Sequence, residues 1–214
     1  MPAEWEQHEA TWLTWPHRLS DWPRKFAPIA WVYGEIVRKL APGEIVRILV
    51  PSAVQETFAR RLLERVGVDL GRVEFFRFPL DRGWARDFGP IFVKDDARRE
   101  AAIARFHFNA WAKYPDWKKD DRVPERVARA LGVPLRAVQH EGRPIVLEGG
   151  SIDVDGGGTL LTTEECNLDP AVQVRNPGLS REGFERVVGD APRRAHSHLA
   201  GCGHRRRRYA RARG

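Results

Sequence analysis

Residues 83–90, Gly-Trp-Ala-Arg-Asp-Phe-Gly-Pro, place an indole, a guanidinium and a carboxylate close together in the chain. The carboxylate of Asp87 can accept two parallel N–H bonds from a planar cation, and the ring of Trp84 can pack on the flat face of that cation. A guanidinium group is the cation that fits this pattern. The alternative is that Arg86 and Asp87 form a surface ion pair and that Trp84 belongs to the core.

Two apolar runs, over 73–78 and 91–93, flank this segment and read as strands. The segment is therefore predicted to be a loop between two strands. Loops at strand ends are held by the rigid sheet beneath them, and binding groups are concentrated there.

The remaining elements follow from hydrophobic spacing and from turn residues. Apolar residues at helical spacing predict a helix over 26–40, which Ala-Pro-Gly at 41–43 ends. Ser52 is the expected N-cap of the next helix, with Gln55 three residues later, and Gly67 ends that helix. Further helices are expected from Pro124 to Leu131 and after Ser180, and strands over 45–50, 101–108, 144–147, 151–154 and 159–163.

The order strand, helix, strand, turn, strand recurs over about 45–94 and 101–163. This period indicates a repeat architecture built from units with mixed sheets. Because such units bury their faces against each other, a partial set leaves an apolar flank exposed, and the chain is expected to form homo-oligomers.

Composition excludes several classes of protein. The 214 residues contain no apolar run of the roughly 18 residues that a membrane span needs, and we expect neither a membrane partner nor a signal peptide. Two cysteines, Cys166 and Cys202, fit a reducing cytoplasm.

The net charge of +7 comes from residues 189–214, which hold eight arginines and one acid, so residues 1–188 sum to zero. A neutral body argues against a fold that binds specific nucleic acids. The run of arginines over 205–208 leaves open the alternative of a degenerate fragment with a basic nucleic-acid-binding tail.

Five segments resemble, in the same order, motifs of the agmatine deiminase family, which belongs with the bacterial peptidylarginine deiminases. They are residues 5–12 (WEQHEATW), 84–90 (WARDFGP), 106–111 (FHFNAW), 147–151 (LEGGS) and 162–166 (TTEEC). The resemblance covers residues 1–188. It implies an α/β fold, namely an incomplete pentein (an α/β propeller of ββαβ units) with roughly the first three of five blades. Residues 1–188 would be the N-terminal part of a deiminase domain.

The family resemblance implies hydrolysis of a guanidino group without a metal or another cofactor. Agmatine would give N-carbamoylputrescine and ammonia, a step toward putrescine, and peptidyl-arginine would give citrulline. The sequence does not separate these substrates. In the family, two carboxylates hold the guanidinium, a cysteine thiolate attacks its carbon and a histidine transfers protons, which agrees with the thiolate being the nucleophilic form of cysteine.

By position in these motifs, Asp87 resembles the first carboxylate that holds the substrate, and Trp84 resembles the wall against the guanidinium face. Glu148 resembles the acid that supports the histidine; a solvated turn residue is the alternative. Gly149 and Gly150 would let the backbone approach closely. Cys166 matches a family cysteine outside the active site, so a buried, inert thiol is expected.

The chain departs from the family pattern at its C-terminal end. The family's histidine lies in a Gly-Asp-Asp-Thr-His-Gly-His-Val-Asp segment and its nucleophilic cysteine lies further on; neither segment occurs in this sequence. We therefore expect a truncated chain without deiminase activity, in which residues 189–214 form an out-of-frame, disordered tail.

The tail suggests a frameshift. Residues 204–214 and a stop codon can be back-translated, with wobble bases of our choice, so that the frame one base later encodes Ile-Ala-Gly-Asp-Asp-Thr-His-Gly-His-Val-Asp. The hypothesis is a single frameshift between about Val187 and Ala195. Nucleotide sequencing of this region decides the question: codons that do not spell the motif in the shifted frame rule the hypothesis out.

Overall fold

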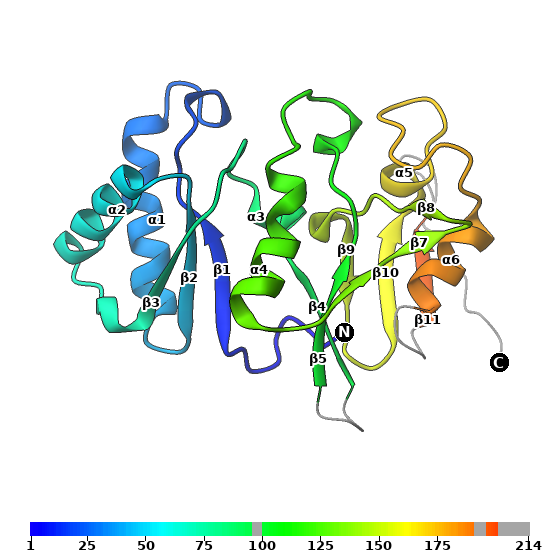
Figure 1. Cartoon of the computed structure of the whole chain (residues 1–214), viewed down its shortest axis with the longest axis horizontal. Coiled ribbons are helices and arrows are strands. Elements are labelled where there is room, and N and C mark those ends of the chain that lie inside the picture. Colours follow the sequence, from blue (N-terminus) through cyan, green and yellow to red (C-terminus); the bar gives the residue numbers. More distant parts are fainter. Residues whose placement is uncertain (96–99, 191–195, 201–214) are drawn as a thin grey trace. The chain divides into compact units, whose positions relative to one another are not determined.

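The computed structural model describes residues 1–95, 100–190 and 196–200. The chain divides into two compact units (Figure 1). One consists of residues 7–85, and the other combines residues 1–6 with the chain from Arg86 onward. Residues 7–85 build a sheet and a core of their own, and the predicted boundary at 188/189 stays a prediction.

Unit 7–85 is a parallel three-stranded sheet in the order β1-β2-β3, with helices in both connections. The strands are β1 (Ala10–Thr14), β2 (Ile45–Val50) and β3 (Val73–Arg77). The helices are α1 (Phe26–Leu40) and α2 (Ala53–Arg65), and short 3₁₀ turns occupy Leu19–Asp21 and Leu70–Arg72. Parallel neighbours require such crossovers, since a tight turn cannot join them.

Local sequence signals explain this unit well. The predicted bounds of α1 and β2 are confirmed, and Ser52 caps α2 by accepting a hydrogen bond from the N–H of Gln55, at 3.3 Å. At Gly34 of α1, a Cβ would lie only 2.7 Å from a methyl group of Leu62 in α2. The glycine therefore lets the two helices pack closely.

The second unit contains the ββαβ arrangement twice. Strands β4 (Ile91–Asp95) and β5 (Glu100–Arg105) pair antiparallel, and α4 (Val123–Leu131) leads to β6 (Leu135–Ala137), which pairs parallel with β5.

The second copy has the same connections. Strands β9 (Ile152–Val154) and β10 (Thr159–Thr163), both predicted, form an antiparallel pair, and α6 (Arg181–Asp190) leads to β11 (His196–Ala200), parallel to β10. Ser180 caps α6 as predicted, since its hydroxyl accepts from the N–H of Gly183. The predicted repeat over 45–94 and 101–163 was placed wrongly, because it joined strands of separate sheets.

Short elements complete this unit. They are α3 (Ala85–Phe88), α5 (Glu164–Asn167), β7 (Gln139–His140), β8 (Arg143–Pro144) and 3₁₀ turns at Ala110–Ala112, Asp120–Arg122 and Gly149–Ser151. The predicted loop over 83–90 thus contains a helical turn. The predicted strand over 144–147 is mostly a bridge, in which His107 pairs with Val146 between two buried residues, Ile145 and Leu147.

One hydrophobic core joins the two ββαβ arrangements. Apolar residues of β4 and β5 pack with residues of β9, β10 and α6, with Phe184 fully buried. Ile145 and Leu147 belong to the same core. Ile152, four residues after Glu148, is buried in this core as well, so the segment that carries Glu148 is fixed before and after that residue.

The expectation of a disordered tail from residue 189 is not met at its start. Helix α6 continues to Asp190, and β11 pairs along β10. An open strand edge offers free N–H and C=O groups, so an extended segment can pair there without a favourable side-chain pattern. Residues 201–214, which carry the arginine run, lie outside the described residues, and their predicted disorder stays a prediction.

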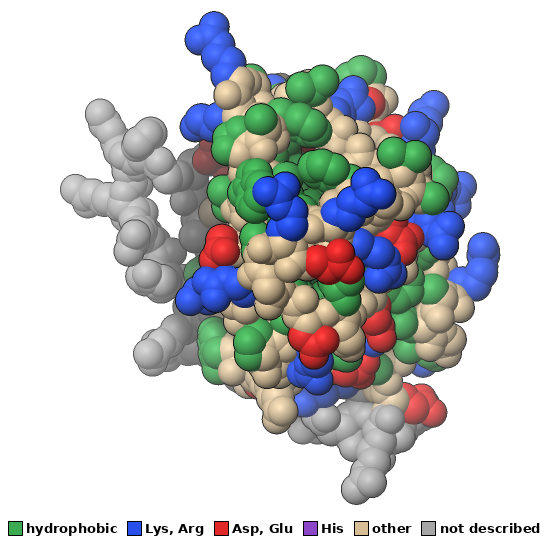
Figure 2. Space-filling view, turned by 90° about the vertical axis from the view of Figure 1, so that its left-hand side faces the viewer, with side chains coloured by type: hydrophobic (Ala, Val, Ile, Leu, Met, Phe, Trp, Pro, Cys, Tyr) green, Lys and Arg blue, Asp and Glu red, His purple; other side chains and the backbone are tan. Residues whose placement is uncertain are grey.

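Helices α1 and α2 expose an apolar surface made of Trp31, Val32, Ile36, Val54 and Phe58. Figure 2, which looks from the side where these helices lie in Figure 1, shows hydrophobic side chains among lysines and arginines. Among the described residues, no helix combines the length and the apolar character that crossing a bilayer requires.

Candidate functional site

Glu148 is the most deeply buried acid of the candidate site. It precedes the 3₁₀ turn Gly149–Ser151 in an extended conformation, and only 2% of the residue is exposed. Its Oε1 accepts a hydrogen bond from Nε of Arg175 at 3.1 Å. Burial raises the pKa of the Glu148 carboxyl, and the Arg175 guanidinium counteracts that rise. Glu148 is therefore not a solvated turn residue.

Asp87 reaches the same turn from α3. Its carboxylate accepts a hydrogen bond from the N–H of Gly150, and burial raises the pKa of the Asp87 carboxyl against this stabilising contact. A Cβ at Gly150 would overlap Oδ1 of Asp87, and a Cβ at Gly149 would overlap the carbonyl oxygen of Arg86. The predicted need for close backbone approach at both glycines is confirmed.

The charges of the two carboxylates act on each other. The negative charge of Asp87 raises the pKa of Glu148, while the charge of Arg175 lowers the pKa of both acids. Asp87, Glu148 and Arg175 together carry a formal net charge of −1, while Arg86, which also acts on Asp87, is paired with Glu4. The cluster thus suits one further monovalent cation.

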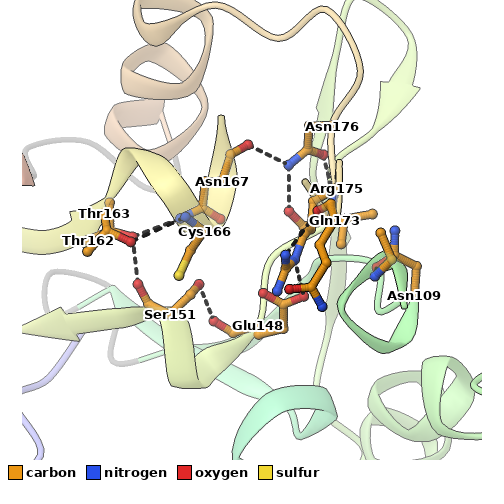
Figure 3. Close-up of polar contacts among 12 residues, drawn as sticks. Asn109, Glu148, Ser151, Thr162, Thr163, Cys166, Asn167, Gln173, Arg175 and Asn176 are labelled. Atoms are coloured by element: carbon orange, nitrogen blue, oxygen red, sulfur yellow. Dashed lines mark hydrogen bonds and ion pairs between the residues drawn. The ribbon is translucent and has the colours of Figure 1, made fainter. Parts of the chain in front are cut away.

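Asn176 holds Arg175 in place. Its side-chain amide accepts from the N–H of Val146 and donates to the C=O of Val146, both at 2.9 Å (Figure 3). Arg175 itself also donates to the C=O of Gln173, at 2.9 Å. These hydrogen bonds hold the segment with Arg175 against Val146, which lies two positions before Glu148.

Arg175 and Asn176 were not predicted as site residues from the sequence. They lie in an irregular segment before α6, where no periodicity or cap pattern marks them. The available signal was indirect, because a buried Glu148 requires a cation from elsewhere in the chain.

A sequence model of the Porphyromonas-type peptidyl-arginine deiminases matches residues 1–191. The chain belongs to this family. An agmatine deiminase of Pseudomonas aeruginosa is 37% identical over 195 residues, which are 89% of this chain and 49% of that protein. One of Stutzerimonas stutzeri is 36% identical over 193 residues, 88% of this chain and 49% of that protein.

Among solved structures, an agmatine deiminase of Enterococcus faecalis superposes with a TM-score of 0.80 at 30% identity, over 95% of this chain and 53% of that chain. The chain spans about half the length of the curated relatives it matches. The α/β fold expected from the resemblance to deiminases is confirmed over that half.

A small cavity adjoins Asp87 in this member of the deiminase family. Its volume is about 10 Å³, and Asp87, Asp121, Phe88, Phe106, Phe108 and Leu147 are among the residues that line it. This volume suits about one water molecule. The cavity by itself is therefore too small for a guanidinium group.

Trp84 lies at the end of unit 7–85. Its indole stacks on that of Trp22, with ring centroids 5.6 Å apart and an interplanar angle of 28°, and 37% of the residue is exposed. It is thus not a core residue. Its role as a wall against a guanidinium face stays a prediction.

The side chain of Arg86 forms an ion pair with the carboxylate of Glu4, and the carboxylate of Asp87 accepts a hydrogen bond from the N–H of Gly150. The main contact of each side chain is therefore not the Arg86–Asp87 surface pair that was the alternative interpretation. Asn109 has a structural contact, since its side chain accepts from the N–H of Ala112 at 2.9 Å.

The prediction that Cys166 is buried is wrong. The residue is half-buried in the first turn of α5, where its N–H donates to the hydroxyl of Thr163. Asn167 takes the buried position instead and donates to the hydroxyl of Thr162 at 2.8 Å (Figure 3). Cys202 lies outside the described residues.

We predict that Gly150→Ala is destabilising, because its methyl group would displace the Asp87 carboxylate. The free energy of unfolding should fall by about 1–3 kcal/mol, typical of an overpacked site. Gly157→Ala is the matched control, since Gly157 is exposed and its nearest contact would be an ordinary 3.5 Å. Urea unfolding of both variants measures the difference; equal stability of the two would contradict the close contact.

Proposed function

We propose that this chain supplies part of the active site of a guanidino-group hydrolase of the agmatine deiminase type. Asp87 would hold the guanidinium of the substrate, with Trp84 against its flat face. Glu148 would orient a proton-transferring histidine. No cofactor is needed for this reaction.

The observation that carries the proposal is that a half-buried Asp87 and a buried Glu148 lie at one turn, with a formal net charge of −1 once Arg175 is counted. A pair of hydrogen-bonding carboxylates in a poorly solvated site is suited to bind and orient a planar cation. The positions of both acids within the family-like motifs support the same roles.

The chemistry explains why such a cradle is required. A guanidinium carbon is a poor electrophile because its positive charge is delocalised over three nitrogens. Carboxylates that bond to those nitrogens orient the group toward a thiolate. Attack of the thiolate, loss of ammonia and hydrolysis of the covalent intermediate would then give the ureido product, with a histidine moving the protons.

Agmatine is the substrate that we propose, with N-carbamoylputrescine as the product on a route to putrescine. Relatives at 36–37% identity are named agmatine deiminases, which favours agmatine over peptidyl-arginine. The two cysteines fit a cytoplasmic location. The apolar surface of α1 and α2 would serve a homo-oligomer contact.

We also propose that the 214-residue chain is inactive by itself, because the motifs of the family's histidine and nucleophilic cysteine do not occur in its sequence. Loss of a nucleophile together with its proton shuttle lowers kcat by about 10⁶ in other hydrolases.

Ammonia release from agmatine tests both parts of the proposal. The purified chain should give no ammonia above background, whereas a version with the reading frame restored near codon 190 should be active. In the restored version, Asp87→Asn should abolish activity, and Asp153→Asn, whose side chain is 75% exposed, should leave it nearly unchanged. Ammonia production by the 214-residue chain that Asp87→Asn removes would overturn the claim of inactivity. If the restored enzyme is active and keeps its activity with Asp87→Asn, the proposed role of Asp87 in holding the guanidinium is wrong.

A further inference from the structure

We infer that Arg175 is a positioning residue that neutralises one of the two site carboxylates and leaves the other for a single guanidinium substrate. Its guanidinium is bonded to Glu148, and Asp87 lies in the same cluster. The inference rests on the proposed function only for the identity of the substrate cation. Its test needs no enzymatic activity, so the two proposals can fail separately.

The ion pair of Arg175 and Glu148 is almost fully enclosed. The side chains are 8% and 2% exposed, and Nε of Arg175 lies 3.1 Å from Oε1 of Glu148. Removing one partner from a buried pair is costly because the remaining charge is left without compensation. Arg175 is thus the group that allows a charged Glu148 at this depth.

The position of Arg175 is fixed by the chain and not by the ion pair alone. Asn176 makes two hydrogen bonds to the backbone of Val146, and Arg175 makes one to the C=O of Gln173 (Figure 3). A guanidinium held in advance loses little entropy when it pairs with the acid. The arrangement is therefore pre-organised before any substrate enters.

Among the described residues, the two acids respond to charges close to them. The pKa of Glu148 is shifted by Arg175 and Asp87, and that of Asp87 by Arg86 and Arg175. Arg86, which is half-exposed and bonded to Glu4, lowers the pKa of Asp87 more than Arg175 does, but it does not shift the pKa of Glu148. Arg175 is the cation shared by both carboxylates.

In this arrangement the two acids have different roles: Glu148 pairs with Arg175, and Asp87 is left to bind the substrate cation. Arg175 takes Oε1 of Glu148, and a carboxylate has a second oxygen for another donor such as an imidazole N–H. Without Arg175, the charge of Asp87 and the burial of Glu148 would raise the pKa of the Glu148 carboxyl with no cation to offset them, which favours its protonated form. A protonated acid binds a guanidinium less well, so Arg175 would set both the charge and the selectivity of the site.

The test compares Arg175→Gln, Arg175→Lys and the double variant Glu148→Gln/Arg175→Gln with the full chain. Urea unfolding midpoints at pH 5 and pH 8 are the measurement, since guanidinium chloride would itself supply the cation. Arg181→Gln is the matched control, because Arg181 forms half-exposed ion pairs with Glu164 and Glu185.

Loss of Arg175 should leave the pKa of Glu148 higher in the folded chain than in wild type. A raised folded-state pKa favours folding at low pH and costs stability as pH rises through it. The midpoint of Arg175→Gln should therefore fall more at pH 8 than at pH 5. Arg175→Lys keeps the charge, so its smaller loss should be equal at both pH values.

The urea unfolding midpoint of the double variant Glu148→Gln/Arg175→Gln at pH 8 should be close to that of wild type, because neither charge of the buried pair remains. If Arg175→Gln lowers the urea unfolding midpoint equally at both pH values, the inference is overturned and Arg175 has a purely structural role. If neither Arg175→Gln nor the double variant folds at pH 5 or pH 8, the proposed charge role of Arg175 is also overturned in favour of a structural one.

Discussion

A buried and a half-buried carboxylate at one turn need a cation, and this constraint governs the part of the chain around residues 86–176. Asp87 and Glu148 lie at one turn, each with a pKa raised by burial, and the charge of Asp87 adds to the rise at Glu148. Arg175 offsets one of the two charges at 3.1 Å from Glu148. The remaining negative charge gives the cluster an affinity for one more cation, which is the physical basis of the proposed guanidinium site.

The surrounding structure serves this cluster. Gly149 and Gly150 have no Cβ, and any Cβ there would overlap the backbone or the side chain of the 86–87 segment. Leu147, just before Glu148, is anchored in the hydrophobic core. Asn176 hydrogen-bonds to both the N–H and the C=O of Val146, which also pairs with His107. Local backbone geometry, core packing and side-chain hydrogen bonds thus act together to hold three charged groups in place.

Sequence reasoning succeeded where the signal is local. Helix α1, strands β2, β9 and β10 and the Ser52 cap follow from periodicity and turn residues, while the site roles that the motif resemblance gives Asp87 and Glu148 stay predictions. Sequence reasoning failed where contacts between distant residues determine the local structure. The conformation of segment 144–147 depends on pairing with His107, and Arg175 pairs with Glu148, which is 27 residues away in the sequence. The half-buried position of Cys166 reflects the turn of α5, which hydrophobicity alone does not reveal.

The central claim is that Asp87 and Glu148 share one poorly solvated, electrostatically coupled site. Carboxyl-detected NMR titration of the chain, with assignments from Asp87→Asn and Glu148→Gln, measures this directly. The account predicts that both carboxyls titrate above the ordinary values for Asp and Glu, and that Asp87→Asn lowers the pKa of Glu148. Ordinary pKa values for both acids, with no effect of either substitution on the other, would contradict it.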